Sequence, residues 1–241
     1  MSPDTERVAL WRRIYGKIKD DVGSGALAPG DKLPSENRLA AHWGVNRHTV
    51  RRALAALEEE GVLRVEQGRG SFVREPVISY PVKRRTRFSE NLLEQRRVPG
   101  NLLLRAGQAE ADAEVAEALG IAQGSEVIRL VTAGEADGRR ISLSISFFPA
   151  RRFPGFIAAY RQEESVTRTL ARFGVADYAR MSSKVIARMP SRDEARELQQ
   201  PRTRPVLVTE SVNVDTDGVP VEFGICLFAS DWVQLVVEPS H

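Results

Sequence analysis

Arginines without neighbouring acids gather in one short segment near residue 50. The sequence VNRHTVRRAL carries Arg47, Arg51 and Arg52, and no Asp or Glu occurs from residue 37 to residue 57. The chain of 241 residues is otherwise nearly balanced, with 35 Lys and Arg against 32 Asp and Glu and a formal net charge of +3. A surface with guanidinium groups and no carboxylates suits a polyanion, so the segment is a candidate for contact with nucleic acid.

The elements that must position these arginines are predicted to be three closely spaced helices. Apolar residues at helical spacing from Val8 to Val22 predict the first helix, which ends at the glycines of VGSGALAPG. Ser35 is a good N-cap for a short second helix, and Asn46 is one for a third helix that stops at Gly61. Three helices joined this tightly predict a helix-turn-helix.

The periodicity changes after Gly61, where VLRVEQGRGSFV alternates apolar and polar residues. This alternation predicts two short strands around a glycine-rich tip, Gln67-Gly68-Arg69-Gly70. Helices followed by such a hairpin form a winged helix. Residues 1–75 are therefore predicted to be a winged helix-turn-helix domain.

The basic segment has two interpretations in such a domain. If Val50, Leu54 and Leu57 face the core, the arginines of the segment face solvent. Basic residues on a helix often form nothing more than a solvated face. The wing, the tight turn and the acid-free window instead favour a helix that enters the major groove of DNA.

A resemblance to a known family supports the second interpretation. The segment LPSENRLAAHWGVNRHTVRRALAALEEEGVLRVEQGRGSFV resembles the DNA-binding domain of GntR-type transcriptional regulators over almost its full length. The resemblance implies contacts with phosphate and groove edge for the arginine of the second helix, with bases and backbone for the third helix, and with a minor groove for the wing tip. The predicted DNA-contacting residues are Arg38, Asn46, Arg47, Thr49, Arg51, Arg52, Gly68 and Arg69.

The remainder of the chain predicts a linker and a second domain. The segment REPVISYPVKRRTR, with two prolines and a basic run, predicts an extended linker over residues 76–87. Residues 88–241 contain hairpin turns at Asp137-Gly138 and Asp217-Gly218 and three helical segments, DAEVAEALG, ESVTRTLARFG and SRDEARELQQ. Hairpins with separate helices predict an α+β domain on an antiparallel sheet.

This second domain resembles the UTRA effector-binding domain of the HutC subfamily of GntR regulators. The resemblance rests on the order of RFSENLLEQ, VAEALGI, ADG, ESVTRTL and VPVEF. It implies a fold similar to that of chorismate lyase. The combination of VNRHTVRRAL with YPVKRRTRFSENLLEQ resembles most the phosphonate-metabolism regulators of the subfamily.

A ligand site is predicted where the second domain begins. In RFSENLL, Ser89 is predicted to cap a helix whose free amides would face an anion, although a serine cap is more often only a cap. The resemblance implies that this loop and Ser165 hold the anionic group of an effector. It also implies that Glu222 contacts the effector's polar part, unless this is a plain sheet carboxylate, and that Phe228 lies at a pocket position, unless it belongs to the core. The predicted effector-binding residues are Arg87, Phe88, Ser89, Glu90, Asn91, Thr132, Ser165, Glu222 and Phe228.

The sequence departs from the subfamily at one place. Members that sense sugar phosphates carry two arginines ahead of the DG hairpin, where this chain has Thr132 and Gly134. Such arginines hold anions through paired hydrogen bonds, so their absence weakens the prediction of an amino-sugar phosphate. Arg87, Arg129 and Arg180 remain unranked as sources of the counter-charge.

The residue inventory disfavours catalysis. His42 and His48 lie in the first domain and His241 is the last residue, so the second domain has no internal histidine for a general base or a metal ligand. The one cysteine, Cys226, lies in the apolar run FGICLF, where an inert thiol is expected. No GxxxxGK phosphate loop occurs. We therefore predict no catalytic residue, no cofactor and no metal site.

Together these features predict a homodimeric repressor that binds double-stranded operator DNA and is released by a small anionic effector, with phosphonate or phosphate metabolism as the first candidate. A regulator that senses a sugar phosphate or a small carboxylate is the alternative, and a lyase-like enzyme comes third. The start MSPDTERVALW lacks the apolar core of a signal peptide, and no apolar run reaches the length of a membrane span. A cytoplasmic protein without membrane contact is expected.

Overall fold

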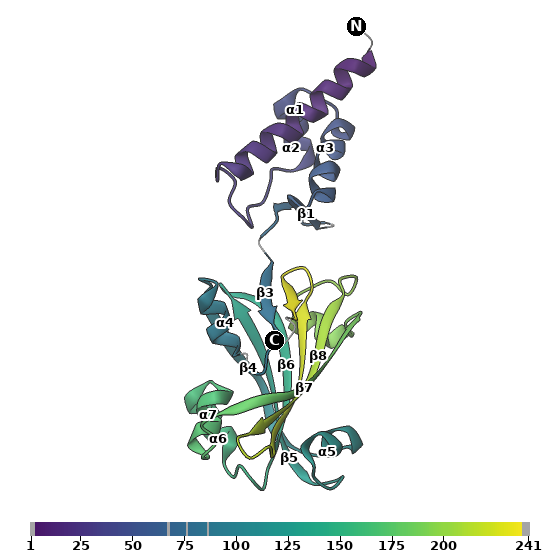
Figure 1. Cartoon of the computed structure of the whole chain (residues 1–241). Coiled ribbons are helices and arrows are strands. Elements are labelled where there is room, and N and C mark those ends of the chain that lie inside the picture. Colours follow the sequence, from purple (N-terminus) through teal and green to yellow (C-terminus); the bar gives the residue numbers. More distant parts are fainter. Residues whose placement is uncertain (1–2, 67, 76, 86, 238–241) are drawn as a thin grey trace. The chain divides into compact units, whose positions relative to one another are not determined.

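The computed structural model describes residues 3–66, 68–75, 77–85 and 87–237, with side chains from residue 10 onward. The chain divides into two compact units, Met1–Pro76 and Val77–His241 (Figure 1). Among the helices of the described residues, none is both long and apolar enough to cross a membrane. The same residues contain no cluster of His, Cys, Asp and Glu that could hold a metal ion.

The first unit consists of three helices and a hairpin, as the sequence predicts. The helices are α1 (Pro3–Gly23), α2 (Glu36–Trp43) and α3 (Arg47–Glu59). The wing is an antiparallel pair, β1 (Leu63–Glu66) and β2 (Gly70–Val73), in which Leu63 lies opposite Val73. A single core joins these elements and contains Ile14, Ile18, Leu33, Leu39, Val50, Leu54, Leu57, Leu63 and Val73. Gln67, at the predicted wing tip, lies outside the described residues.

Local hydrogen bonds fix the turn between α2 and α3. Gly44 ends α2 in the left-handed conformation, with φ of +63°, which glycine adopts without steric cost. The Oδ1 atom of Asn46 accepts a hydrogen bond from the amide of Thr49 at 2.9 Å and caps α3. Ser35 caps α2 in the same way through the amide of Arg38. Both predicted caps are confirmed.

The second unit is built on a six-stranded antiparallel sheet. Its strand order is β4-β5-β6-β9-β8-β7, so β4 and β7 form the edges. The bounds are β4 (Pro99–Glu110), β5 (Glu126–Ala136), β6 (Arg139–Pro149), β7 (Tyr178–Arg188), β8 (Val206–Asp215) and β9 (Pro220–Ala229). The two predicted hairpins are β5–β6 and β8–β9. In the first, Asp137 and Gly138 both have positive φ, as a tight hairpin turn requires.

Five short helices surround this sheet. They are α4 (Phe88–Glu94), α5 (Ala113–Leu119), α6 (Phe156–Glu163), α7 (Val166–Arg172) and α8 (Arg192–Glu197). The caps of α5, α7 and α8 are the side chains of Asp112, Ser165 and Ser191. An aromatic core forms where α6 packs, with the rings of Phe148 and Phe156 4.4 Å apart between centroids. The patterns in the sequence do not predict α6, β4 or β7.

The structure differs from the predicted linker over residues 78–81. These residues form β3 (Ile78–Pro81), which pairs in parallel with β10 (Val233–Val236). Ile78 and Tyr80 alternate with polar or less buried neighbours and are buried against Leu92 and Phe228. This alternation is a strand signal inside a segment whose prolines and cations had suggested an extended connector. The chain is therefore anchored in the second unit well before α4 begins.

Candidate functional site

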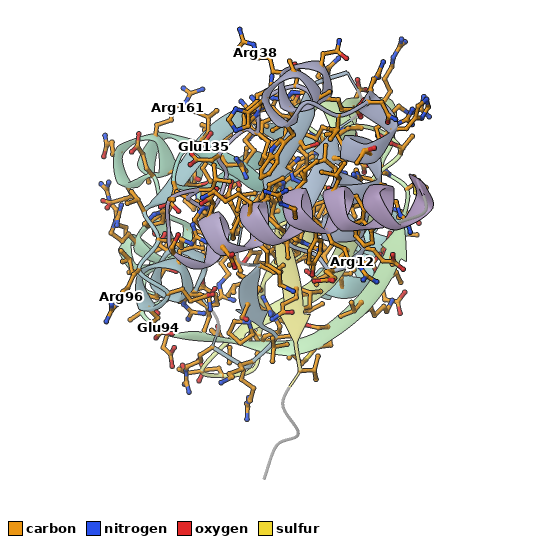
Figure 2. The ribbon with its side chains drawn as sticks, turned by 90° about the horizontal axis from the view of Figure 1, so that it is seen from above. Arg12, Arg38, Glu94, Arg96, Glu135 and Arg161 are labelled. Carbon is orange, nitrogen blue, oxygen red and sulfur yellow. The ribbon has the colours of Figure 1, made fainter. Side chains whose placement is uncertain are left out.

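The exposed arginines of the first unit lie on α2, α3 and the wing. Arg47 and Arg51 project from α3, and each side chain is 60% exposed. Arg38 is exposed on α2, and Figure 2 shows its side chain pointing away from the ribbon. At the wing, Gly68 is exposed with φ of +79° and Arg69 is exposed beside Glu66. The predicted cationic residues of α2, α3 and the wing tip are thus available to a partner.

One acid belongs to this surface although the sequence places it just outside the acid-free window. The carboxylate of Glu36, at the start of α2, lies 2.5 Å from Nε of Arg47 and 3.8 Å from Nε of Arg51. Exposed ion pairs of this kind contribute little to stability, so a phosphate or a base could replace the carboxylate. Glu36 holds the two guanidinium groups near each other in the free protein. Sequence reasoning missed this residue because the pairing depends on the angle between the two helices.

Two other residues of the predicted DNA-contacting set have partners inside the unit. The guanidinium of Arg52 lies 4.7 Å from the centroid of the Trp11 ring and so joins α3 to α1. The side chain of Asn46 caps α3, where it binds both the amide and the hydroxyl of Thr49. These contacts stabilise the arrangement of the helices whether or not DNA is bound.

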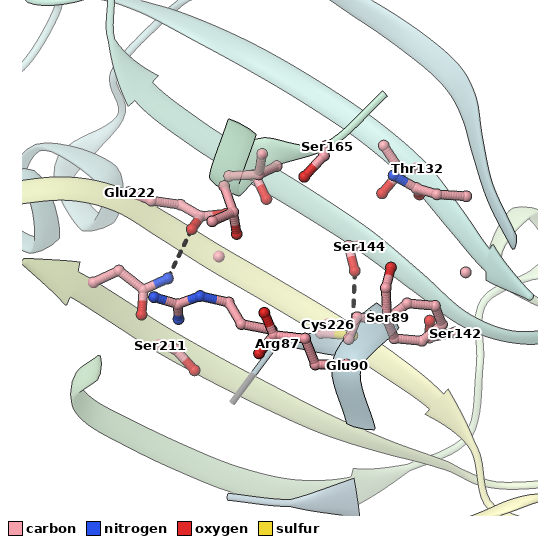
Figure 3. A pocket seen from close by; sticks show the side chains of 18 of the residues that line it. Arg87, Ser89, Glu90, Thr132, Ser142, Ser144, Ser165, Ser211, Glu222 and Cys226 are labelled. Atoms are coloured by element: carbon pink, nitrogen blue, oxygen red, sulfur yellow. Dashed lines mark hydrogen bonds between the residues drawn. The ribbon is translucent and has the colours of Figure 1, made fainter. Parts of the chain in front are cut away.

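The second unit contains a pocket of about 490 Å³ whose floor is one face of the sheet (Figure 3). Antiparallel register brings side chains from several strands into rows on this face, because directly opposite residues point to the same side. One row contains Thr132, Ser144, Cys226 and Thr209, from β5, β6, β9 and β8. Ser142 and Ser146 extend the hydroxyl lining along β6. The floor therefore offers many small hydrogen-bonding groups and little bulk.

The thiol of Cys226 is part of this floor. The hydroxyl of Ser144 donates to Sγ of Cys226 at 3.2 Å (Figure 3). Burial in the protein raises the pKa of the Cys226 thiol to about 11. The thiol is consequently protonated near neutral pH, which agrees with an inert cysteine rather than a nucleophile.

Opposite charges occupy one end of the pocket. Arg180, Asn213 and Glu222 lie in one row across β7, β8 and β9. Glu222 is only 7% exposed, and its Oε2 atom accepts a hydrogen bond from Nδ2 of Asn213 at 2.7 Å (Figure 3). Arg87 enters the pocket from the segment before α4, where it stacks 3.8 Å from the centroid of the Tyr178 ring. Burial in turn raises the pKa of the Tyr178 hydroxyl to about 12.

The start of α4 differs from the prediction. The amide of Asn91 donates to the carbonyl of Arg87, so Arg87 is the N-cap residue and no side chain caps this helix. Ser89 lies in the first turn and is not the cap, so that prediction was wrong. The cap of α7 is Ser165, whose hydroxyl accepts from the amide of Arg168 at 3.3 Å. Ser89 and Ser165 nevertheless both line the pocket.

The other predicted effector-binding residues divide into two groups. Phe88, Glu90 and Thr132 line the pocket together with Arg87. Asn91 and Phe228 do not. Asn91 is buried and its Oδ1 atom accepts from Gln95, and Phe228 is 1% exposed with its ring 4.7 Å from that of Tyr80. The core interpretation of Phe228 is therefore the correct one, because its side chain packs beneath β3 and not into the pocket.

The surroundings of Gly134 leave no room for an arginine at this position. A Cβ atom at this position would lie within 3.0 Å of both the Ser142 hydroxyl and the Phe88 ring. The ring of Phe88 thus fills the space in which a side chain at position 134 would stand. Of the three arginines left unranked by the sequence, Arg87 and Arg180 line the pocket and Arg129 does not.

A winged helix-turn-helix with a basic third helix, joined to an α+β domain that encloses a polar pocket, defines a DNA-binding regulator with a small-molecule site. Comparison with known families agrees with this class. Residues 10–73 match the family described as bacterial regulatory proteins, gntR family, and residues 94–234 match the UTRA domain. The chain belongs to the GntR family of transcriptional regulators, in its UTRA-containing HutC subfamily, and this is a family of regulators rather than enzymes.

Individual relatives match over almost the whole chain. The Uncharacterized HTH-type transcriptional regulator RB1450 of Rhizobium meliloti (strain 1021) is 44% identical over 96% of this chain and 95% of its own length. The Probable transcriptional regulator PhnF of Escherichia coli (strain K12) is 32% identical, with 95% and 94% covered. The crystal structure of PhnF from Mycobacterium smegmatis shares the fold, with a TM-score of 0.66, 24% identity, and coverage of 96% and 99%.

The close contact between Gly134 and Phe88 predicts that even a methyl group at position 134 destabilises the second unit. We expect Gly134→Ala to lower the stability of the second unit by about 1–3 kcal/mol, because the added methyl group overlaps Ser142 and Phe88. Thermal unfolding of Gly134→Ala, Phe88→Ala and the double variant measures the coupling. The double variant should lose less stability than the two single variants lose together. If the stability losses are additive, the contact between position 134 and Phe88 is contradicted.

Proposed function

We propose that this regulator is a repressor that leaves its operator when a small anionic molecule binds in the UTRA pocket. The proposal rests on one observation: Arg87 and Arg180 line the same pocket whose floor carries serine and threonine hydroxyls. Guanidinium and hydroxyl groups are the donors that phosphonate, phosphate and carboxylate groups accept from. The likeness to proteins named PhnF supports phosphonate or phosphate as the first class to examine.

A sugar phosphate is the second candidate class, and one contact counts against it. The Phe88 ring occupies the space next to Gly134. This end of the pocket therefore has no arginine at position 134 to bind a phosphate, and it has less room for a sugar. A small anion needs less space. We therefore rank simple phosphonates, phosphate and small carboxylates above sugar phosphates.

The position of the pocket in the chain supports coupling to the DNA-binding unit. Arg87, Phe88 and Ser89 line the pocket and follow closely in sequence after the first unit, which ends at Pro76. A ligand that binds Arg87 acts on the segment between α4 and β3, the first strand of the second unit. Ligand binding then favours one of two conformations by its difference in affinity for them, and the other conformation fits the operator.

We also propose that the protein acts as a homodimer that pairs through β7. All residues from 181 to 187 of this edge strand are exposed, although Met181, Val185 and Ile186 are apolar, with exposed fractions of 63%, 46% and 49%. An unpaired apolar edge strand is an aggregation hazard unless something covers it. A second copy can do so by antiparallel pairing about a two-fold axis, which also suits a two-fold operator.

A direct test of the proposed function combines stability with DNA release. Full-length protein is mixed with methylphosphonate, inorganic phosphate, acetate or N-acetylglucosamine 6-phosphate, and both its melting temperature and its binding to a duplex selected from a random pool are measured. We expect at least one small anion to raise the melting temperature and weaken DNA binding, because it binds one conformation preferentially. The proposal is wrong if no compound that stabilises the protein changes its affinity for DNA.

Recognition of DNA by α3 predicts a contrast between adjacent arginines. Arg51→Ala and Arg47→Ala should each weaken operator binding by about 1–3 kcal/mol without lowering the melting temperature, because both side chains are exposed. Arg52→Ala should lower the melting temperature because it removes the contact with Trp11. Band-shift titrations and thermal melts measure both effects, with Arg161→Ala on α6 as the control. Unchanged operator binding in the Arg47 and Arg51 variants would contradict the assignment.

The proposed dimer contact predicts a change of oligomeric state. Val185→Lys combined with Ile186→Lys should give a folded monomer, because two ammonium groups on each strand would face each other across the axis. Sedimentation measures the mass, and circular dichroism checks that the fold is kept. The matched control is Leu102→Lys on β4, the other edge strand, where the side chain is 43% exposed. A dimer that survives the double substitution and dissociates in the control would place the interface at β4 instead.

A further inference from the structure

The charged end of the pocket has a feature that a simple anion does not use. Arg180 on β7 and Glu222 on β9 lie in one row with Asn213 between them. Their backbone positions are two strand spacings apart, roughly 10 Å. Within the described part of the chain, no Lys, Arg or His nitrogen lies within 4.0 Å of the Glu222 carboxylate. The two opposite charges are therefore present at the same end of the pocket and unpaired with each other.

The carboxylate of Glu222 would repel an anionic ligand, so its presence is unexpected in a pocket that binds only anions. Its carboxylate is almost fully buried, and among the described residues its one hydrogen bond is from the amide of Asn213 to Oε2. A buried carboxylate with a single neutral donor is energetically costly, and an ammonium group beside it offsets that cost. The amide orientation also matters, because Nδ2 of Asn213 faces Glu222 and its Oδ1 atom remains an acceptor. Oε1 of Glu222 is therefore left to accept from a positively charged donor, and Oδ1 of Asn213 is a further acceptor in the same row.

Arg180 supplies the opposite requirement. Its Nε atom is buried and has no hydrogen-bond partner among the described residues, although the side chain lines the pocket. A buried guanidinium nitrogen without an acceptor is a site for an incoming oxygen atom. The guanidinium of Arg87 stacks on the ring of Tyr178, two residues before Arg180 on β7. The side chains of Arg87 and Arg180 therefore both line the pocket. They come from β7 and from the segment before α4, and not from the β5 positions occupied by Thr132 and Gly134.

We infer that the effector is a small zwitterion, with an anionic group held by Arg180 and Arg87 and an ammonium group held by Glu222 and Asn213. This inference rests on the proposed function, since it specifies the ligand of the same pocket. It makes Arg180 a specificity-determining residue, which the sequence could not distinguish from Arg129. It also gives a role to the buried carboxylate of Glu222, which lines the same pocket as Arg87 and Arg180.

Matched ligands that differ by one charged group test the inference. Calorimetric titration of the full-length protein compares 2-aminoethylphosphonate with ethylphosphonate and ethylamine, and β-alanine with propionate. We expect a zwitterion to bind about tenfold or more tightly than the anion that lacks the amine, because the ammonium group pairs with a buried carboxylate. Ethylamine alone should bind weakest. The phosphonate and carboxylate series separate the two sources of the anionic group.

Three variants assign the charges to residues. Glu222→Gln keeps the shape and the contact with Asn213 and should bring the affinities for zwitterion and matched anion close together. Arg180→Gln should weaken both by about tenfold or more. Arg129→Gln is the control, because this arginine lies on β5 outside the pocket. Melting temperatures and operator binding of each unliganded variant establish that the fold is retained.

The outcomes separate this inference from the proposed function. If ethylphosphonate or propionate binds the parent protein as tightly as its amino counterpart and still releases DNA, the zwitterion is wrong and the proposed function stands. If Arg180→Gln binds the anions as the parent does, the role of Arg180 is wrong. If no compound in either series binds, both the inference and the proposed effector class fail. The parent comparison needs no variant, so the inference can be refuted even if Glu222→Gln does not fold.

Discussion

Antiparallel register across five strands decides which side chains meet in the pocket. Successive residues of a strand point to opposite faces, so a slip of one residue in β9 would move Glu222 and Cys226 to the other side of the sheet. The tight turn at Asp137-Gly138 and the turn at residues 215–219 hold the two hairpins against such a slip. Buried apolar residues on the opposite face, such as Leu143 and Val208, favour the same register. The chemistry of the pocket therefore follows from the pairing of the strands.

The two units use charge in different ways. On α3 the guanidinium groups of Arg47 and Arg51 are exposed and share one exchangeable carboxylate, that of Glu36. Such an arrangement suits a surface that meets a highly charged, hydrated partner, where each contact is weak and many add together. In the pocket, the Glu222 carboxylate and the Nε atom of Arg180 are buried, and an unpaired buried charge is costly, so discrimination between ligands is correspondingly sharp.

Features set by neighbouring residues could be predicted from the sequence, and features set by distant contacts could not. The caps Ser35 and Asn46 and the turn at Asp137-Gly138 depend on a few consecutive residues, and the structure contains them. The cap assigned to Ser89 was wrong because the N-cap of α4 is Arg87, two residues earlier, and the helix begins at Phe88. Strand β7 was missed because its residues 181–187 are all exposed, so most of the strand has no alternation of burial to mark it. The filling of the space above Gly134 by Phe88 joins residues 46 positions apart, and no local pattern indicates it.

The parallel pairing of β3 with β10 has a consequence for the order in which the protein is made. The amide of Gln234 donates to the hydroxyl of Ser79 across 155 residues of sequence, so this part of the second unit forms only after residues 233–236 have been synthesised. The core of the first unit is assembled from residues before 74 and can fold on the ribosome much earlier. A nascent chain thus acquires its helix-turn-helix before its pocket. A ribosome that stops short of residue 233 releases a DNA-binding unit attached to a sensor whose first strand has no partner.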